Sequence, residues 1–139
     1  MSRCFTDDFT NPTEDIHGHG THVAGIIGAA GNNSVGISGA CWNIQIVSLR
    51  IATESGELSR EGLADAIEYA EEKGIKILNY SGGGVEYSAD VAAAISNYSG
   101  IIICAAGNSG VNNDTTPFYP ASYNYNNIIS VGINKNWLC

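Results

Sequence analysis

Short apolar segments alternate with amphipathic segments along most of the chain, and this alternation limits the fold more than any other feature. The apolar, β-branched segments predict strands at residues 44–51, 75–80, 101–106 and 128–133. Residues 59–74 and 88–100 carry apolar side chains at helical spacing, and each segment begins with a serine that can act as an N-cap. Nearly continuous apolar strands separated by helices are typical of parallel sheets. We therefore expect an α/β fold, a three-layer parallel sheet with helices on both faces.

The composition is that of one globular domain. The chain has 139 residues, of which 44% are apolar and 14% are charged. The apolar share excludes a disordered chain, and the length is close to the commonest domain size. We expect residues 1–139 to form a single domain.

The charge balance excludes several classes of partner. Six basic residues against fourteen acidic ones give a net charge of −8, so we expect no nucleic-acid binding. The longest apolar segments, such as residues 101–106, are far shorter than the ~20 residues that cross a bilayer, so we expect a soluble protein without a membrane partner. Residues 1–8 lack the apolar core of a signal peptide. The location stays open between secreted and intracellular.

The four cysteines are far apart in the sequence and have no zinc-binding spacing. Cys104 lies in an apolar segment and Cys41 lies beside Trp42, so we expect both to be buried free thiols. A disulfide between Cys4 and Cys139 is an open alternative.

All three histidines lie within six positions, at His17, His19 and His22. The small and apolar residues that follow predict a helix beginning at or near His19. The helix dipole there disfavours a charged imidazole, and a neutral imidazole can act as a general base at pH 7.

Metal binding and a purely structural role are the alternatives for this cluster. The spacing HxHxxH allows His19 and His22 to share a helix face, and imidazole is a common zinc ligand. His17 would have to fold back over Gly18 to join them, and Asp15 could supply a carboxylate. We favour the catalytic role for His19 and expect no metal there.

Two glycine-rich loops follow neighbouring predicted strands. Residues 81–84 read SGGG and residues 107–110 read GNSG. Sites in parallel sheets form at the carboxyl ends of strands, and glycine allows a ligand to approach the backbone closely. We expect the functional site there.

Several motifs together resemble those of the subtilisin-like serine peptidases. They are GHGTHVAGIIGA around His19, ILNYSGG at residues 77–83, AAGNSG at residues 105–110 and YPA at residues 119–121, in the family's order. The resemblance covers nearly the whole chain, from about Phe5 to Ile133. It implies a serine-type endopeptidase that acts on polypeptides and needs no cofactor for its chemistry.

The resemblance also implies roles for individual residues. His19 would be the catalytic base, and the Asn108 side chain would donate to the oxyanion of the tetrahedral intermediate. Ser81, Gly82 and Gly83 would pair through their backbone with an extended substrate. The family usually has leucine where Gly82 stands, which puts any inherited side-chain preference in doubt. Asn in a turn beside Gly107 is the structural alternative for Asn108.

Only one member of the Asp-His-Ser triad has a match. Asp7, Asp8 and Asp15 are too close to His19 in the sequence, no serine motif follows, and Ser109 matches a loop position without that role. We expect part of a peptidase domain, inactive by itself, with exposed apolar surface that promotes aggregation or association. A non-catalytic peptide-binding module is the alternative function.

Two further features are implied by the resemblance. The loop Asn32-Asn33-Ser34 is where many relatives bind a structural calcium ion. Tyr119-Pro120 resembles a turn in which the family has a cis proline.

Overall fold

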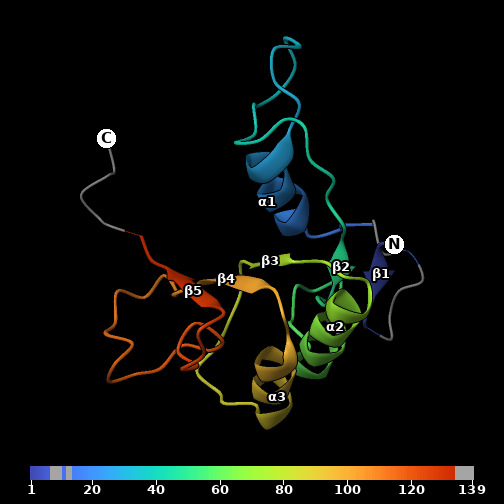
Figure 1. The fold of residues 1–139 in the computed structure, drawn as a ribbon. Helices are drawn as coiled ribbons and strands as arrows, with labels where there is room; N and C mark the ends of the chain where they lie inside the picture. Colours follow the sequence, from blue (N-terminus) through green and yellow to red (C-terminus); the bar gives the residue numbers. More distant parts are fainter. Residues whose placement is uncertain (7–10, 12–13, 134–139) are drawn as a thin grey trace. The chain divides into compact units, whose positions relative to one another are not determined.

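The computed structural model describes residues 1–6, 11 and 14–133, so Asp7, Asp8 and Cys139 lie outside the described residues. The chain divides into two compact units, Met1–Ser59 and a second unit that begins at Arg60. Figure 1 shows the helices and strands of both units.

The first unit contains one helix and a short parallel ladder. The strands β1 (Arg3–Cys4) and β2 (Leu49–Arg50) pair in parallel. The helix α1 (His19–Gly28) begins after Gly18, which has a positive φ of 83°. At the other end of α1, the backbone N–H groups of residues 39–41 donate to carbonyls of residues 26, 27 and 29. These bonds satisfy carbonyls that a helix end leaves without partners.

The predicted strand at residues 44–51 is wrong over most of its length. Within this segment only Leu49–Arg50 pairs in a ladder, and its partner β1 is two residues long. Ile44 and Ile46 have the right residue type for a strand, but their side chains are exposed. Residues with a high strand propensity therefore did not form a strand where no neighbouring strand paired with them.

The second unit contains the parallel sheet. The strands β3 (Ile77–Tyr80), β4 (Ile101–Ala105) and β5 (Ile128–Val131) lie in the order β3-β4-β5, and both pairs are parallel. All three strands fall within predicted segments, because each is a short apolar segment bounded by turn residues. The carboxyl ends of the three strands therefore lie at one edge of the sheet.

Two helices connect these strands and carry the core. The helix α2 (Arg60–Glu72) ends before Gly74, which has a φ of 68° and allows Ile75 N–H to donate back to Ala70 O. In α3 (Ala89–Asn97) the Ser88 hydroxyl accepts from Val91 N–H at 3.3 Å, as its N-cap position predicts. The buried apolar side chains of this unit come from α2, from α3 and its C-cap residue Tyr98, from β4 and from Tyr123: Ala64, Ala66, Ile67, Ala70, Val91, Ala92, Ala94, Ile95, Tyr98, Ile102, Cys104 and Tyr123.

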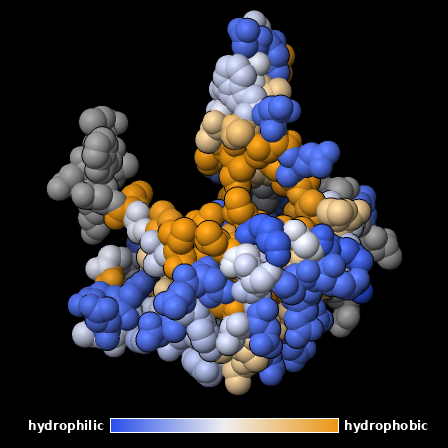
Figure 2. Space-filling view, viewed as in Figure 1, coloured by the Kyte–Doolittle hydropathy of each residue, from blue (hydrophilic) through white to orange (hydrophobic). Residues whose placement is uncertain are grey.

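The two faces of the sheet differ sharply. Figure 1 shows α2 and α3 on the same side of the sheet, and Ile102 and Cys104 point to that side and are buried. Alternate residues point the other way, and Ile101, Ile129 and Val131 are exposed there. Figure 2 shows apolar side chains gathered over β4 and β5. The predicted parallel α/β arrangement is present, and within this unit its helices lie on one face.

The described cysteines Cys4, Cys41 and Cys104 are free thiols. Cys104 is buried, as expected. The burial expected for Cys41 is wrong, because Cys41 and Trp42 both lie in an exposed loop after α1. Among residues 1–6, 11 and 14–133, no helix has the length and apolar character that spanning a membrane requires.

Candidate functional site

His19 is the first residue of α1, and its side chain is exposed. The Asp15 carboxylate fixes this helix start, because it accepts from Gly18 N–H at 2.9 Å and from Thr21 N–H at 2.6 Å. Such bonds satisfy N–H groups that the first turn of a helix leaves without partners. The predicted position of His19 at the beginning of a helix is confirmed.

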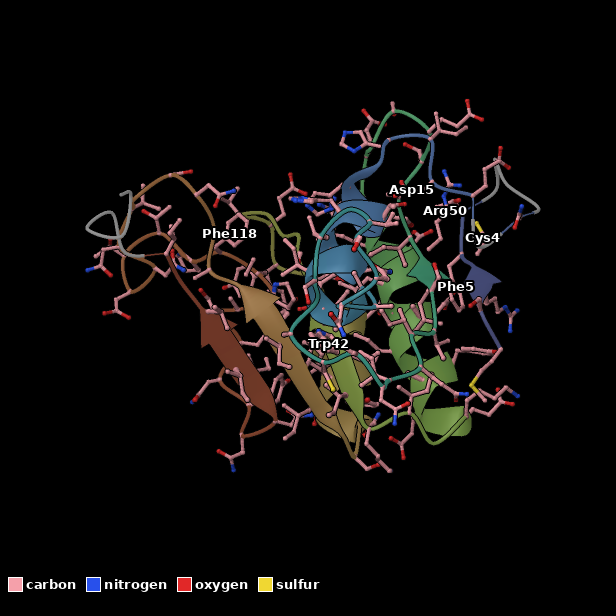
Figure 3. All side chains as sticks on the ribbon, turned by 90° about the horizontal axis from the view of Figure 1, so that it is seen from above. Cys4, Phe5, Asp15, Trp42, Arg50 and Phe118 are labelled. Carbon is pink, nitrogen blue, oxygen red and sulfur yellow. The ribbon has the colours of Figure 1, made fainter. Side chains whose placement is uncertain are left out.

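Asp15 is ionised and held in place by its surroundings. Partial burial acts to raise the pKa of this carboxyl, but the hydrogen bonds from Thr21 and Gly18 and the charge of Arg50 outweigh it, so the pKa is lowered. Figure 3 shows Asp15 beside Arg50, and an Arg50 Nη1–H group donates to the carbonyl of Glu14. Asp15 therefore positions the helix that carries His19.

The other two histidines do not form a metal site with His19. The rings of His17 and His19 are edge to face, with centroids 6.4 Å apart. His22 lies one turn along α1 and is exposed. In the described part of the chain, no three His, Cys, Asp or Glu side chains come close enough to hold one metal ion.

Ser81, Gly82 and Gly83 follow the carboxyl end of β3. Ser81 is exposed, and its hydroxyl accepts from the Asn79 side-chain amide at 3.0 Å. Gly84 and Tyr119 exchange two backbone hydrogen bonds, of 3.0 and 2.7 Å, which tie this turn to the loop that precedes β5. The backbone of the turn is thus anchored at Gly84.

Asn108 follows the carboxyl end of β4, the strand next to β3, and its side chain is exposed. The preceding Gly107 has a φ of 93°, a left-handed conformation that favours glycine. The two glycine-rich loops therefore begin at neighbouring strands, at the same edge of the sheet.

A cavity of about 160 Å³ lies beside Asn108 and was not predicted from the sequence. Its lining includes Asn108, Asn113 and Phe118. The Asn113 amide donates to Ala106 O at 2.9 Å, whereas its Oδ1 is buried without a hydrogen-bond partner. Nothing in the sequence around Asn113 distinguishes it from the exposed asparagines of the same loop.

Phe118 is the second residue that the sequence did not single out. A Cβ atom added to Gly83 would lie 2.3 Å from Phe118 Cε1, and one added to Gly107 would lie 3.4 Å from Phe118 Cγ. The ring therefore lies against Gly83 and near Gly107, one residue from each glycine-rich loop. The one signal in the sequence is its place directly before Tyr119-Pro120, whose peptide bond is cis, as the resemblance implied.

The one buried thiol of the described strands is not a nucleophile. Burial raises the pKa of Cys104 to about 12, so the thiol stays protonated at neutral pH. Burial, with a smaller effect of Cys104, also raises the pKa of the neighbouring Tyr80 to about 12. Cys104 is a core group, and Tyr80 lies half-buried beside it.

The loop proposed for calcium supplies few ligands. Asn32 and Ser34 have positive φ angles, of 57° and 60°. The Asn33 side-chain oxygen accepts from Val35 N–H at 3.1 Å, and the loop contains no carboxylate. These residues do not form a calcium site by themselves.

The structure thus brings together Ser81, Gly82, Gly83 and Asn108, which all belong to the second unit. His19 belongs to the first unit, at the exposed start of its helix.

Comparisons with known proteins identify the family. The model of the subtilase family matches residues 4–136. The chain is 37% identical over 131 residues to the thermophilic serine proteinase of Bacillus sp. (strain AK1). The aligned region covers 92% of this chain and 31% of that protein. It is 36% identical over 122 residues to thermitase of Thermoactinomyces vulgaris, and the aligned region covers 86% of this chain and 42% of thermitase.

A solved structure, that of Sphericase, has the same fold. It matches with a TM-score of 0.78 and 30% identity, over 91% of this chain and 44% of that chain. This likeness confirms the predicted subtilisin-like α/β fold. The chain spans less than half the length of each of these three proteins. On the extent of the family match, this chain belongs to the subtilase family.

Proposed function

We propose that these 139 residues are part of one serine endopeptidase domain that hydrolyses polypeptides. His19 takes the proton from a serine hydroxyl and returns it to the leaving amine. Asn108 stabilises the oxyanion. The backbone of Ser81, Gly82 and Gly83 pairs with an extended substrate. Nucleic acid and membranes are not partners, and the chemistry needs no cofactor.

The observation that supports this most is the placement of the two glycine-rich loops. They follow neighbouring parallel strands at one edge of the sheet, and Ser81 and Asn108 are both exposed there. A substrate strand paired with Ser81–Gly83 would bring a carbonyl group within reach of the Asn108 amide. The exposed imidazole of His19, at a helix start fixed by Asp15, suits proton transfer with a bound reactant.

The chain by itself does not hydrolyse peptides in this proposal, because none of its residues matches the aspartate or the serine of the triad. Without an activated nucleophile the covalent step has no starting group. Turnover of a fluorogenic peptide by the purified chain, abolished by a serine-directed phosphonate, would contradict this. A structural calcium ion stays a prediction, and its ligands would have to come in part from other residues.

The first experiment is to sequence the native transcript and its flanking DNA on both sides. The proposal expects the reading frame to continue through an aspartate motif upstream and a GTSMA-like motif downstream. In that product, His19→Ala should lower kcat roughly 10⁶-fold, as the loss of a triad member does. Asn108→Ala should lower it roughly 10²–10³-fold. His22→Ala and Asn126→Ala are the matched controls and should leave kcat nearly unchanged.

A non-catalytic peptide-binding module is the second candidate, and the single matched triad residue favours it. This second candidate predicts that the native reading frame begins at Met1 and ends at Cys139. It also predicts that peptides bind at Ser81–Gly83 without being hydrolysed. Transcript sequencing and a peptide titration together decide between the two candidates.

A further inference from the structure

The loop that carries Asn108 has few contacts of its own. Residues 107–111 make no hydrogen bond to any residue that the structure describes, and the Asn108 side chain is exposed. Every residue from 106 to 111 lines the cavity of about 160 Å³, so the loop borders open space along its length. The position of the Asn108 amide therefore depends on how the two ends of the loop are held.

Asn113 closes this loop on the end of β4. Its side-chain amide donates to the carbonyl of Ala106 at 2.9 Å, across seven positions of the chain. That carbonyl belongs to the peptide unit that joins Ala106 to Gly107, and the Ala106 N–H group donates to Val131 O at 2.9 Å. The backbone is thus fixed on both sides of Ala106, directly before the left-handed Gly107 and the Asn108 that follows.

A tight turn restricts the backbone at Asn113. The Asn112 side-chain oxygen accepts from Asp114 N–H at 2.9 Å. The Asn112 carbonyl accepts from the N–H groups of Thr115 and Thr116, at 3.1 and 2.9 Å. These bonds span Asn113 in the sequence, so its side chain reaches the end of β4 from a preorganised segment.

The other polar atom of the Asn113 side chain indicates which of its groups is important. Asn113 Oδ1 is buried and has no hydrogen-bond partner among the described residues. This costs free energy that an apolar side chain of similar size would avoid. Aspartate has the same shape as asparagine, but its carboxylate has no N–H group to donate. The bond to Ala106 O is therefore what an amide supplies at this position.

We infer that Asn113 is a positioning residue that holds Asn108 in place for the oxyanion through its hydrogen bond to Ala106 O. This inference rests on the proposed function, in which the Asn108 amide meets a charge that develops in the transition state. A misplacement of about 1 Å can lower a rate roughly 10²-fold. Asn113 acts on the loop and not on the substrate.

Backbone order in the 139-residue chain tests the structural step. Asn113→Leu keeps much of the side-chain volume and removes both the donor and the buried unpaired oxygen, so the chain should stay folded. The ¹⁵N order parameters of residues 107–111 should fall from about 0.85, typical of a rigid backbone, to below about 0.6. Asn124→Leu, the same change at an exposed asparagine of the same unit, should leave them unchanged. Asn113→Asp, which also lacks the donor, answers the question if Asn113→Leu does not fold.

A double-mutant cycle in the longer product of the extended reading frame tests the catalytic step. Asn113→Leu should lower kcat roughly 10–10²-fold and change KM less than about twofold, because the Asn108 amide acts in the transition state. In Asn108→Ala the same substitution should cause no further loss, since the group that it positions is gone. Asn124→Leu should leave both constants unchanged.

The outcomes distinguish the inference from the proposed function. Unchanged order parameters in Asn113→Leu, or additive losses of kcat in the double variant, would overturn the role of Asn113 and leave Asn108 standing as the oxyanion donor. An unchanged kcat in Asn108→Ala would contradict the proposed function and overturn the inference with it. A native reading frame that ends at Cys139 would do the same.

Discussion

The two units of this chain differ in how much apolar core supports their candidate site residues. Among the described residues, the buried apolar side chains of Met1–Ser59 reduce to Ile51, whereas the second unit buries side chains of α2, α3, β4 and Tyr123. The helix α1, which carries His19, has no buried residue, whereas α3 buries Val91, Ala92, Ala94 and Ile95. The loops with Ser81–Gly83 and Asn108 thus extend from a packed core, and the helix that begins at His19 does not.

Regions with few buried apolar contacts open at a lower free energy than packed cores do. Within the first unit, α1 is held mainly by hydrogen bonds: the Asp15 carboxylate at its start and the N–H groups of residues 39–41 at its end. Within the second unit, packing of α2 and α3 adds to the hydrogen bonds. We therefore expect amide protons of α1 to exchange with solvent faster than those of α3 and β4.

Truncation of a core side chain should give the largest difference between the units. Ile95 in α3 is fully buried, and Ile95→Ala should lower the free energy of unfolding by about 2–5 kcal/mol, because it removes apolar contacts and leaves a cavity. The matched change Ile26→Ala in α1, where the side chain is 53% exposed, should cost less than about 1 kcal/mol. Urea unfolding followed by NMR peaks of each unit measures both.

Equal losses for the two substitutions would break the comparison, since they would mean that Ile26 is buried in solution. The same result would indicate that the other exposed apolar side chains are also covered in solution. A small loss at Ile95 would instead mean that the second unit has no cooperative core.

The contrast also explains which features could be predicted from the sequence. The existence of α2, α3 and β3 follows from local patterns, with Ser88 and Gly74 at helix ends, and is confirmed, although α3 ends at Asn97 rather than near residue 100 and β3 begins at Ile77 rather than at residue 75. The strand predicted at residues 44–51 failed because pairing depends on a partner that is short. The contact of Phe118 with Gly83 and Gly107 joins three segments far apart in the sequence, so no local pattern could reveal it. Of the candidate site, the sequence supplied the loops but not what fills the space between them.

Removal of the N-cap of α3 should have an intermediate effect on the free energy of unfolding. Ser88→Ala removes the hydroxyl that accepts from Val91 N–H, and it should lower the free energy of unfolding by about 1 kcal/mol. Ser96→Ala, an exposed change on the same helix, is the control and should be nearly neutral. Thermal unfolding of the two variants measures the difference. A loss at Ser96 as large as at Ser88 would contradict this prediction, because alanine is the better helix former and the loss at Ser88 could then not be assigned to its cap.

Acid titration should give the smallest effect and compares one carboxylate from each unit. Burial acts to raise the pKa of Asp15, but hydrogen bonds from Thr21 and Gly18 and the Arg50 charge outweigh it and leave the pKa below its ordinary value. Hydrogen bonds from the Ser99 backbone and side chain lower the pKa of Glu71. Because each folded-state pKa lies below its unfolded value, each carboxylate stabilises its unit above the unfolded pKa. That contribution is lost as the pH falls through the folded pKa.

The amide shifts of Thr21 and Ser99, followed by NMR as the pH is lowered, should therefore both change below the ordinary carboxyl range. The α1 signals should broaden first, because their unit has little core to hold the helix once Asp15 is protonated. Simultaneous loss of both sets of signals would mean that the two units unfold together.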